Sequence, residues 1–211
     1  MWTPSAYGSH DIQISATTNT GGTTTISRTI VVVQNASSIN VKTLNGVIIE
    51  YTVDTDSKWH YGTYTLPQSV GAFDTINATL TVECPEIEGG CDDWDRLSHI
   101  EIKAPNGNWI QIIRYVTPYG IGCNHVTDLT NYNSLLQGEV EFRVFIDTWG
   151  SGGWQLSLDL EYNQGTPSYD YSSVTEIWDN DYDFGDPSNL QPVESYNFNL
   201  NSGIQQSYLS V

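Results

Sequence analysis

The chain has 211 residues, of which 38% are hydrophobic and 15% are charged, so a packed core is expected and disorder is not. Twenty-five acidic residues oppose seven basic ones, giving a formal net charge of −18 that repels nucleic acid and anionic membranes and excludes both as partners. No apolar run is long enough to span a bilayer, so membrane insertion is excluded as well.

Residues 1–35 contain two strand-like runs, around 11–17 and 25–33. The order of Trp, Pro and Gly, then DIQISATT and TIVVV, resembles the end of an immunoglobulin-like repeat. Two strands cannot form a sandwich alone, so they either pack on the next domain or belong to a domain that is otherwise absent. Because the sequence is already β-like near Met1, any signal peptide is expected to lie upstream.

The dominant pattern in residues 36–166 is strand alternation, and helical periodicity is almost absent. Apolar and polar residues alternate from Ile76 to Val82 and again from Trp154 to Tyr162. The run HIEIKAPNGNWIQIIRYV indicates two strands around a PNGN turn. This pattern predicts an all-β fold, an antiparallel jelly-roll sandwich with partial β segments on both sides.

Residues 167–211 begin with a polar linker and continue with strand-like runs such as SYNFNLNSG. We interpret them as a linker and the first strands of a second, truncated jelly roll. An acidic run in this segment raises calcium binding as an alternative. A solvated acidic loop is favoured, because the glycine is one position late for an EF-hand loop and no glutamate closes it. The acidic residues are Asp179, Asp181, Asp183 and Asp186.

Three cysteines cannot all pair with one another. Cys84 and Cys91 lie close in sequence, with a proline and two glycines between them, and are predicted to form a disulfide. That bond implies an oxidising compartment. Cys123 is then a free thiol and is expected to be buried. No further ligand pair lies near Cys84 and Cys91, and the four histidines form no H-x-H pair, so neither a metal nor another cofactor is expected.

Several short motifs follow one another along the central segment. They are ECP…C-D-x-W-D-R, RYVTPYGIG, DLTNYNSLLQG, DTW and YNQGTPSYDYS. Their order and spacing resemble bacterial peptide-N-glycosidase F, from about residue 40 to about residue 173. The resemblance implies that residues 36–166 are the N-terminal one of two jelly rolls that lie side by side in that family. It also implies cleavage of the amide between asparagine and the first GlcNAc of an N-linked glycan.

The resemblance assigns roles to five positions: Asp95 as the base that activates water, Asp147 as a supporting catalytic acid, and Trp94, Arg96 and Trp149 as contacts to the glycan. Asp95 matches the family's catalytic carboxylate, and Trp94 and Arg96 match the residues that flank it. Asp147 stands where the family has a glutamate, and Trp149 matches the tryptophan of the same motif. Two departures follow: the Asp147 side chain is shorter by one methylene, and the family's other essential acid lies in a second jelly roll that residues 1–211 do not include.

The residues alone leave other interpretations open. Asp95 could form a structural ion pair with Arg96 or Arg114, Asp147 could be a solvated outward residue, and the two tryptophans could be edge aromatics. In EFRVFIDTW, alternation places Asp147 on one strand face with aromatic neighbours, which favours a binding surface. If a disulfide between Cys84 and Cys91 fixes the loop before Asp95, the Asp95 carboxylate can activate water for amide hydrolysis. Tryptophan can stack on a sugar ring.

The sequence therefore predicts part of a secreted or cell-surface bacterial amidase that acts on N-linked glycans or glycopeptides. As residues 1–211 alone it is expected to be inactive, because other domains of the same chain complete the site. The alternative is a non-catalytic glycan-binding or adhesion module of a large surface protein. A purely structural domain of such a protein is a third possibility.

Overall fold

A computed structural model of the chain describes residues 8–32, 38–51, 58–68, 73–150, 152–165, 167, 173–176, 187–188, 197 and 203. Strands make up most of these ranges, together with one short 3-10 helix, η1 (Thr130–Tyr132). None of the described ranges contains a helix with the length and apolar character needed to cross a membrane.

The first described element is an antiparallel hairpin of β1 (Gly8–Thr17) and β2 (Thr23–Val32). Its turn contains Gly21 at a φ of 89°, a conformation that favours glycine. The hairpin lies within the segment 1–35 predicted from sequence. Its membership of an immunoglobulin-like repeat stays a prediction.

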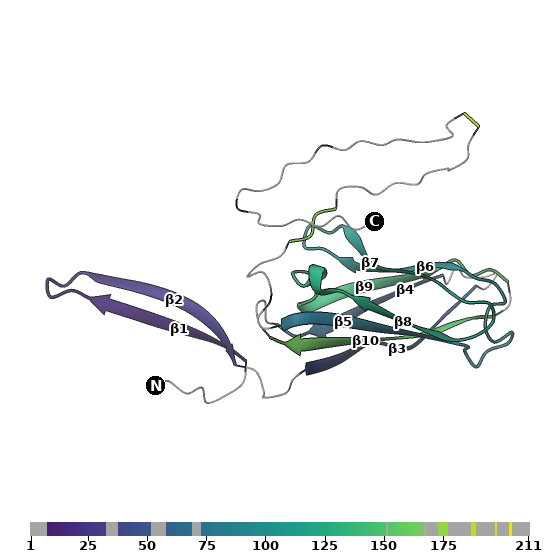
Figure 1. Ribbon diagram of the computed structural model, residues 1–211, viewed down its shortest axis with the longest axis horizontal. Coiled ribbons are helices and arrows are strands. Elements are labelled where there is room, and N and C mark those ends of the chain that lie inside the picture. The colour runs from purple at the N-terminus through teal and green to yellow at the C-terminus, as the bar shows by residue number, and fades with distance from the viewer. Residues whose placement is uncertain are drawn as a thin grey trace. The chain divides into compact units, whose positions relative to one another are not determined.

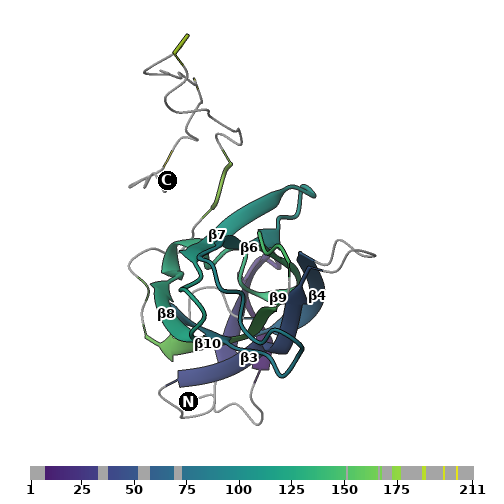
Figure 2. The ribbon, with the colours of Figure 1, turned by 90° about the vertical axis from the view of Figure 1, so that its right-hand side faces the viewer.

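The main body is a sandwich of two four-stranded antiparallel sheets (Figures 1 and 2). We call them the β10 sheet, in the order β3-β10-β5-β8, and the β9 sheet, in the order β4-β9-β6-β7. The strands are β3 (Ser38–Glu50), β4 (Trp59–Leu66), β5 (Phe73–Glu83), β6 (Leu97–Lys103), β7 (Trp109–Val116), β8 (Cys123–Asp128), β9 (Gly138–Ile146) and β10 (Gly153–Gln164). Most consecutive strands of the sandwich lie in different sheets, as in a jelly roll.

The core lies between the two sheets and follows the predicted alternation. Alternate residues from Ile76 to Val82 in β5 and from Trp154 to Tyr162 in β10 are buried. Phe142, which lies on β9 in the opposite sheet, is also fully buried. These observations confirm the predicted all-β antiparallel jelly roll, whose inward faces exclude water from a continuous apolar layer.

One strand prediction is wrong. β9 ends at Ile146, so Asp147 and Trp149 do not continue its outward face. Beyond the last buried residue the chain turns, with the Thr148 N–H donating to the Ile146 carbonyl at 2.8 Å. The Asp147 N–H donates instead to the Leu97 carbonyl, at 3.1 Å. Both predicted site residues therefore stand on a turn at one end of the sandwich.

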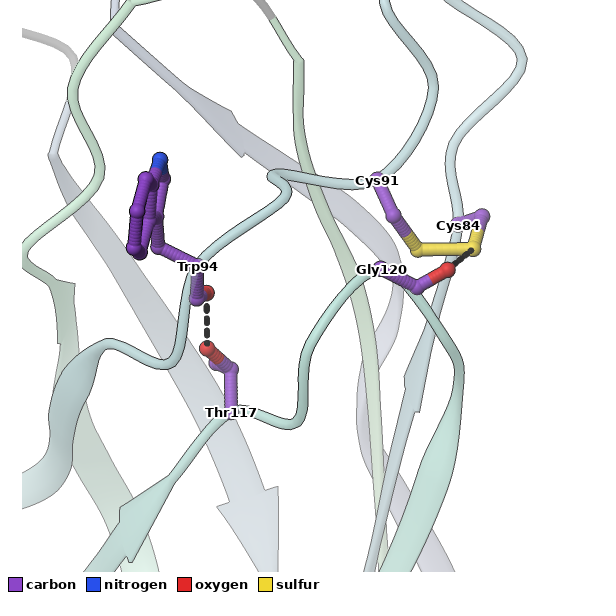
Figure 3. The surroundings of a disulfide bond; sticks show 5 residues. All are labelled: Cys84, Cys91, Trp94, Thr117 and Gly120. Carbon is purple, nitrogen blue, oxygen red and sulfur yellow. Dashed lines mark hydrogen bonds between the residues drawn. A yellow bond between two sulfur atoms is a disulfide. The ribbon is translucent and has the colours of Figure 1, made fainter.

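The predicted disulfide between Cys84 and Cys91 is present (Figure 3). Cys123 is free. The expectation that Cys123 is buried is wrong, because it is half-buried on β8, an edge strand of the β10 sheet. Its Sγ lies 3.2 Å from Nε2 of His125.

Backbone hydrogen bonds join the loop closed by the disulfide, residues 84–91, and the residue after it to the start of β10. The Asp92 N–H donates to the Gly153 carbonyl at 3.2 Å, and the Gly153 N–H donates to the Gly90 carbonyl at 2.9 Å. Gly152 has a φ of 93°, and a Cβ there would lie 2.9 Å from the Cys91 carbonyl oxygen. Glycine is therefore required at 152 for this close approach.

Asp92, next to the disulfide, is 1% exposed and accepts four hydrogen bonds. Its Oδ2 accepts from Arg96 Nε at 2.7 Å and from Thr148 Oγ1 at 2.6 Å. Its Oδ1 accepts from Arg96 Nη2 at 2.9 Å and from the Trp94 N–H at 3.0 Å. Burial alone would raise the pKa of Asp92, but these hydrogen bonds and the Arg96 charge lower it.

Reduction of the Cys84–Cys91 bond should destabilise the chain by about 2–3 kcal/mol, because the bond restricts a short loop in the unfolded state. Urea unfolding of the Cys84→Ala/Cys91→Ala variant measures the difference, with Cys123→Ala as the control. Peptide mapping without reductant should find only Cys123 alkylated. A map in which all three thiols react would contradict the disulfide.

Asp92→Ala should lower the free energy of unfolding by about 3 kcal/mol, because it leaves the half-buried Arg96 without its carboxylate. Exposed Asp93, mutated to alanine, is the control and should change stability by less than about 0.5 kcal/mol. Equal losses in both variants would contradict the role of Asp92.

The same carboxylate predicts a pH dependence. An unfolded aspartate has a pKa near ~3.9, and the folded pKa of Asp92 is lower. Its contribution to stability is therefore fully present above the unfolded pKa and disappears as the pH falls through the folded one. Urea midpoints of the wild type should fall more steeply than those of Asp92→Asn below about pH 4. Parallel profiles would rule out this linkage.

Candidate functional site

The stretch that follows Asp92 carries Trp94 toward solvent. The Trp94 backbone is held at both ends, since its N–H donates to Asp92 and its carbonyl accepts from Thr117 Oγ1 at 3.4 Å. Figure 3 shows the indole projecting on the side away from the disulfide. The side chain is 62% exposed, so the backbone is fixed while the ring stays open to a ligand.

Asp95, the predicted catalytic carboxylate, is exposed beside Trp94. Its carboxylate lies near the Tyr119 hydroxyl, and interaction with this carboxylate raises the pKa of that hydroxyl. The Tyr119 and Trp94 rings are 6.5 Å apart between centroids. Tyr119 belongs to the RYVTPYGIG motif, but nothing in the sequence gives it a role at the site. Arg96 forms its ion pair with Asp92 and not with Asp95.

A second cluster surrounds the predicted Asp147. Its Oδ1 accepts from Lys58 Nζ at 3.0 Å and from the indole Nε1 of Trp149 at 2.8 Å. Lys58 is 5% exposed, and its Nζ lies 2.9 Å from the centroid of a Trp149 ring. The Tyr51 ring is 5.4 Å from that of Trp149. A buried cation therefore fixes both the carboxylate and the exposed indole.

The sequence contains no signal for Lys58 or Tyr51. Lys58 precedes Asp147 by 89 positions, and no motif of the resemblance includes either residue. Only the fold brings β4 beside β9 and so places the lysine under the turn that holds Asp147. The Ile146 N–H donates to the Lys58 carbonyl at 3.1 Å, which ties the two segments directly.

The two clusters occupy neighbouring segments at the same end of the sandwich. Arg96 Nη2 donates to the Trp149 carbonyl at 3.3 Å, and Thr148 donates to Asp92. The turn after β9 is thus fastened to the loop before β6. All five sequence-predicted residues therefore come from two segments that contact each other, with Trp94, Asp95 and Trp149 exposed and Arg96 half-buried.

This arrangement combines exposed aromatic rings with two carboxylates in distinct settings. Asp95 can take a proton from water, and Trp94 and Trp149 can stack on the apolar face of a sugar ring. Within the ranges that the structure describes, no group of three or more His, Cys, Asp or Glu residues could hold a metal ion. The acidic residues between 179 and 186 lie outside the described residues.

Comparison with known proteins agrees with the geometry. Residues 100–162 match the family model described as Peptide-N-glycosidase F, N terminal. The chain is 33% identical over 147 residues to peptide-N(4)-(N-acetyl-β-D-glucosaminyl)asparagine amidase F of Elizabethkingia miricola. The aligned region covers 67% of this chain and 41% of that relative.

Solved structures give the same picture. PNGase F, a glycosylasparaginase from Flavobacterium meningosepticum, superposes with a TM-score of 0.63 at 32% identity, covering 68% of this chain and 47% of that one. PNGF-II shares the fold, with a TM-score of 0.51 at 16% identity, covering 62% of this chain and 35% of that one. The chain spans less than half the length of these relatives. It contains an N-terminal domain of the peptide-N-glycosidase F family.

Proposed function

We propose that the chain is the N-terminal half of an amidase that removes N-linked glycans by hydrolysing the amide between asparagine and the first GlcNAc. The observation that carries this proposal is the 33% identity to an amidase of that name over 67% of the chain. The exposed Asp95, beside Trp94 on a segment that is hydrogen-bonded to the turn carrying Trp149, supports it. An extracytoplasmic location, secreted or at the cell surface, is supported by the disulfide.

The domain organisation is part of the proposal. Residues 36–166 are the N-terminal jelly roll, and residues 167–211 are a linker with the first strands of the second. Residues 1–35 are the end of an immunoglobulin-like repeat. The complete site then forms with other domains of the same chain, which supply a further acid and the opposite wall of the cleft.

In the proposed reaction the Asp95 carboxylate takes a proton from water. The water oxygen attacks the side-chain carbonyl carbon of the glycosylated asparagine, and the bond from that carbon to nitrogen breaks. The nitrogen leaves, after protonation, as the amino group of the glycan, and the asparagine becomes aspartate. Trp94 and Trp149 contact the sugar rings.

Arg96 and Asp147 act mainly by positioning in this scheme. The guanidinium of Arg96 already binds Asp92 and the Trp149 carbonyl, so it fixes both sides of the site before substrate arrives. Asp147 is a supporting acid whose Oδ1 is held by Lys58 and by Trp149. The lysine gives this shorter acid a fixed place at the site.

The second candidate is a glycan-binding or adhesion module without catalysis. The exposed indoles of Trp94 and Trp149 favour it, since they suit sugar stacking whether or not a bond is broken. The two functions differ in one measurement: binding alone leaves an N-glycoprotein intact.

Glycan release from a denatured N-glycoprotein tests the proposal. The full reading frame that contains residues 1–211 should release glycan, and Asp95→Ala should slow it at least about 100-fold, with Asp93→Ala as the control. Residues 1–211 alone should release none, because each missing stabilising partner typically costs about 10²–10³ in rate. Release that survives Asp95→Ala would remove Asp95 from the mechanism, and release by residues 1–211 would make the second jelly roll dispensable.

The Lys58–Asp147 pair predicts an asymmetric effect on stability. The Lys58 side chain is 7% exposed and that of Asp147 is 42% exposed. Asp147→Ala leaves a buried ammonium group without its carboxylate and should cost about 3 kcal/mol. Lys58→Met leaves only a half-exposed acid and should cost about 1 kcal/mol. Urea unfolding of both variants measures this order, and a larger loss for Lys58→Met would contradict it.

A further inference from the structure

The outward face of the β9 sheet carries an aromatic cluster that the proposed function does not use. Register places Trp59 opposite Phe145 and Tyr61 opposite Arg143 on adjacent strands β4 and β9. Phe142, Val144 and Ile146 of β9 face the core, so their neighbours at 143 and 145 face outward. We call the outward set the aromatic platform: Trp59, Tyr61, Trp109, Phe145 and Arg143.

Arg143 fixes the centre of the aromatic platform. Its guanidinium carbon lies 4.8 Å from the ring centroid of Trp59 and 4.7 Å from that of Trp109, so the cation is stacked between two indoles. Arg143 also forms an ion pair with Glu101 of β6. The two tryptophans come from the two edge strands of the sheet, and one cation orders them together.

The other rings complete a continuous surface. The ring centroids of Trp59 are 6.2 Å from Tyr61 in a stacked arrangement and 4.7 Å from Phe145. Tyr61 and Trp109 meet edge to face at 6.1 Å. Tyr61 is 58% exposed, while the tryptophans are half-buried against their neighbours. The platform is therefore ordered before any ligand binds, which reduces the entropy that binding must overcome.

A polar depression of about 340 Å³ lies on the same sheet next to the aromatic platform. Its lining includes Thr63, Glu139, Glu141 and Lys103, together with the turn between β6 and β7. Lys103 belongs to both features, because its Nζ pairs with Glu141 at 2.9 Å and lies 5.7 Å from the Trp109 centroid. Rings and hydrogen-bonding groups are thus adjacent, the combination that small-molecule sites use.

The fold itself does not require these aromatic residues. The β10 sheet must also bury apolar side chains on its inward face, yet the outward side chains of its two central strands are all polar. In β5 and β10 they are Thr75, Asn77, Thr79, Thr81, Gln155, Ser157, Asp159, Glu161 and Asn163. A solvated outer face on central strands is therefore compatible with this sandwich, and the packing of the two sheets does not require the aromatic rings on the β9 sheet.

Charge selects the kind of ligand. The two cations that lie over the rings have carboxylate partners, Arg143 with Glu101 and Lys103 with Glu141, in a chain of net charge −18. An anionic ligand would meet the surrounding negative field, and a cationic one would find the carboxylates of Glu101 and Glu141 already paired. A neutral ligand with apolar faces and many hydroxyls fits rings and paired charges together.

We propose that the aromatic platform and its depression bind a neutral oligosaccharide, independently of the proposed amidase reaction. Pyranose C–H faces would stack on Tyr61 and Trp109, and sugar hydroxyls would bond to the groups of the depression. From Phe145 to Glu141 the surface runs for about 14 Å along β9, enough for more than one sugar ring. It begins beside the candidate site, since Trp59 follows Lys58 directly.

Affinity electrophoresis of residues 1–211 tests this proposal with soluble mannan, galactomannan, hydroxyethyl cellulose and glycol chitin, and with anionic alginate. At least one neutral polysaccharide should retard the protein, and alginate should not. Tyr61→Ala and Trp109→Ala should each weaken the retardation about tenfold or more. Because Trp109 packs on Arg143, Trp109→Phe provides a second variant that keeps a ring at this position.

Matched controls separate the platform from the candidate site. Val126→Ala changes an exposed residue on the β10 sheet and should bind as the wild type does. Trp94→Ala removes an exposed indole near Asp95 and measures how much of the retardation comes from the candidate site. No retardation of the folded wild type by any neutral polysaccharide overturns the proposal. Loss of binding in Trp94→Ala but not in Tyr61→Ala also overturns it. Self-association that Tyr61→Ala abolishes, without polysaccharide binding, would make this face a protein interface instead.

Discussion

The candidate site depends on one buried carboxylate. Asp92 accepts hydrogen bonds from the Trp94 backbone, from Arg96 and from Thr148, and so joins the loop before β6 to the turn after β9. A buried charge is tolerated only when its oxygens are satisfied, and here both oxygens accept two hydrogen bonds each. The alternatives to this arrangement leave an ion without partners, so the two segments have one favoured relative position.

That constraint explains why exposed site residues can still be well placed. Trp94 and Trp149 are both more than half exposed, and Lys58 and Asp147 hold the Trp149 ring. Their backbones are fixed as well, the first by Asp92 and Thr117 and the second by Arg96. The Cys84–Cys91 disulfide and the glycine contacts at the start of β10 hold the loop from its other end. The backbone is thus ordered while both indoles stay accessible, which suits the proposed stacking on sugar rings.

Sequence patterns predicted those parts of the molecule that local periodicity determines. Alternation in β5 and β10 identified inward residues, because one face of each strand must be buried. Alternation gave the wrong prediction at Asp147, because the alternating pattern continues in the sequence after the strand has ended. The turn at Asp147 depends on contacts with Leu97 and Lys58, which are distant in sequence. Asp92 was missed because the CDDWDR run offers three aspartates and the resemblance singled out Asp95. The four-residue spacing from Asp92 to Arg96 was the available signal, but the Thr148 partner lies 56 positions away.

The few cations of this acidic chain are used to organise aromatic rings. Only seven basic residues are present, and three of them lie over indoles: Lys58 on Trp149, Arg143 between two tryptophans and Lys103 near Trp109. Each of the three is also paired with a carboxylate. Ring position is therefore set by charge at the candidate site and on the β9 sheet alike, while each of these three cations is neutralised by its own carboxylate. On the β9 sheet, rings ordered beside paired charges present oriented π faces, which supports the proposed neutral, hydroxyl-rich ligand.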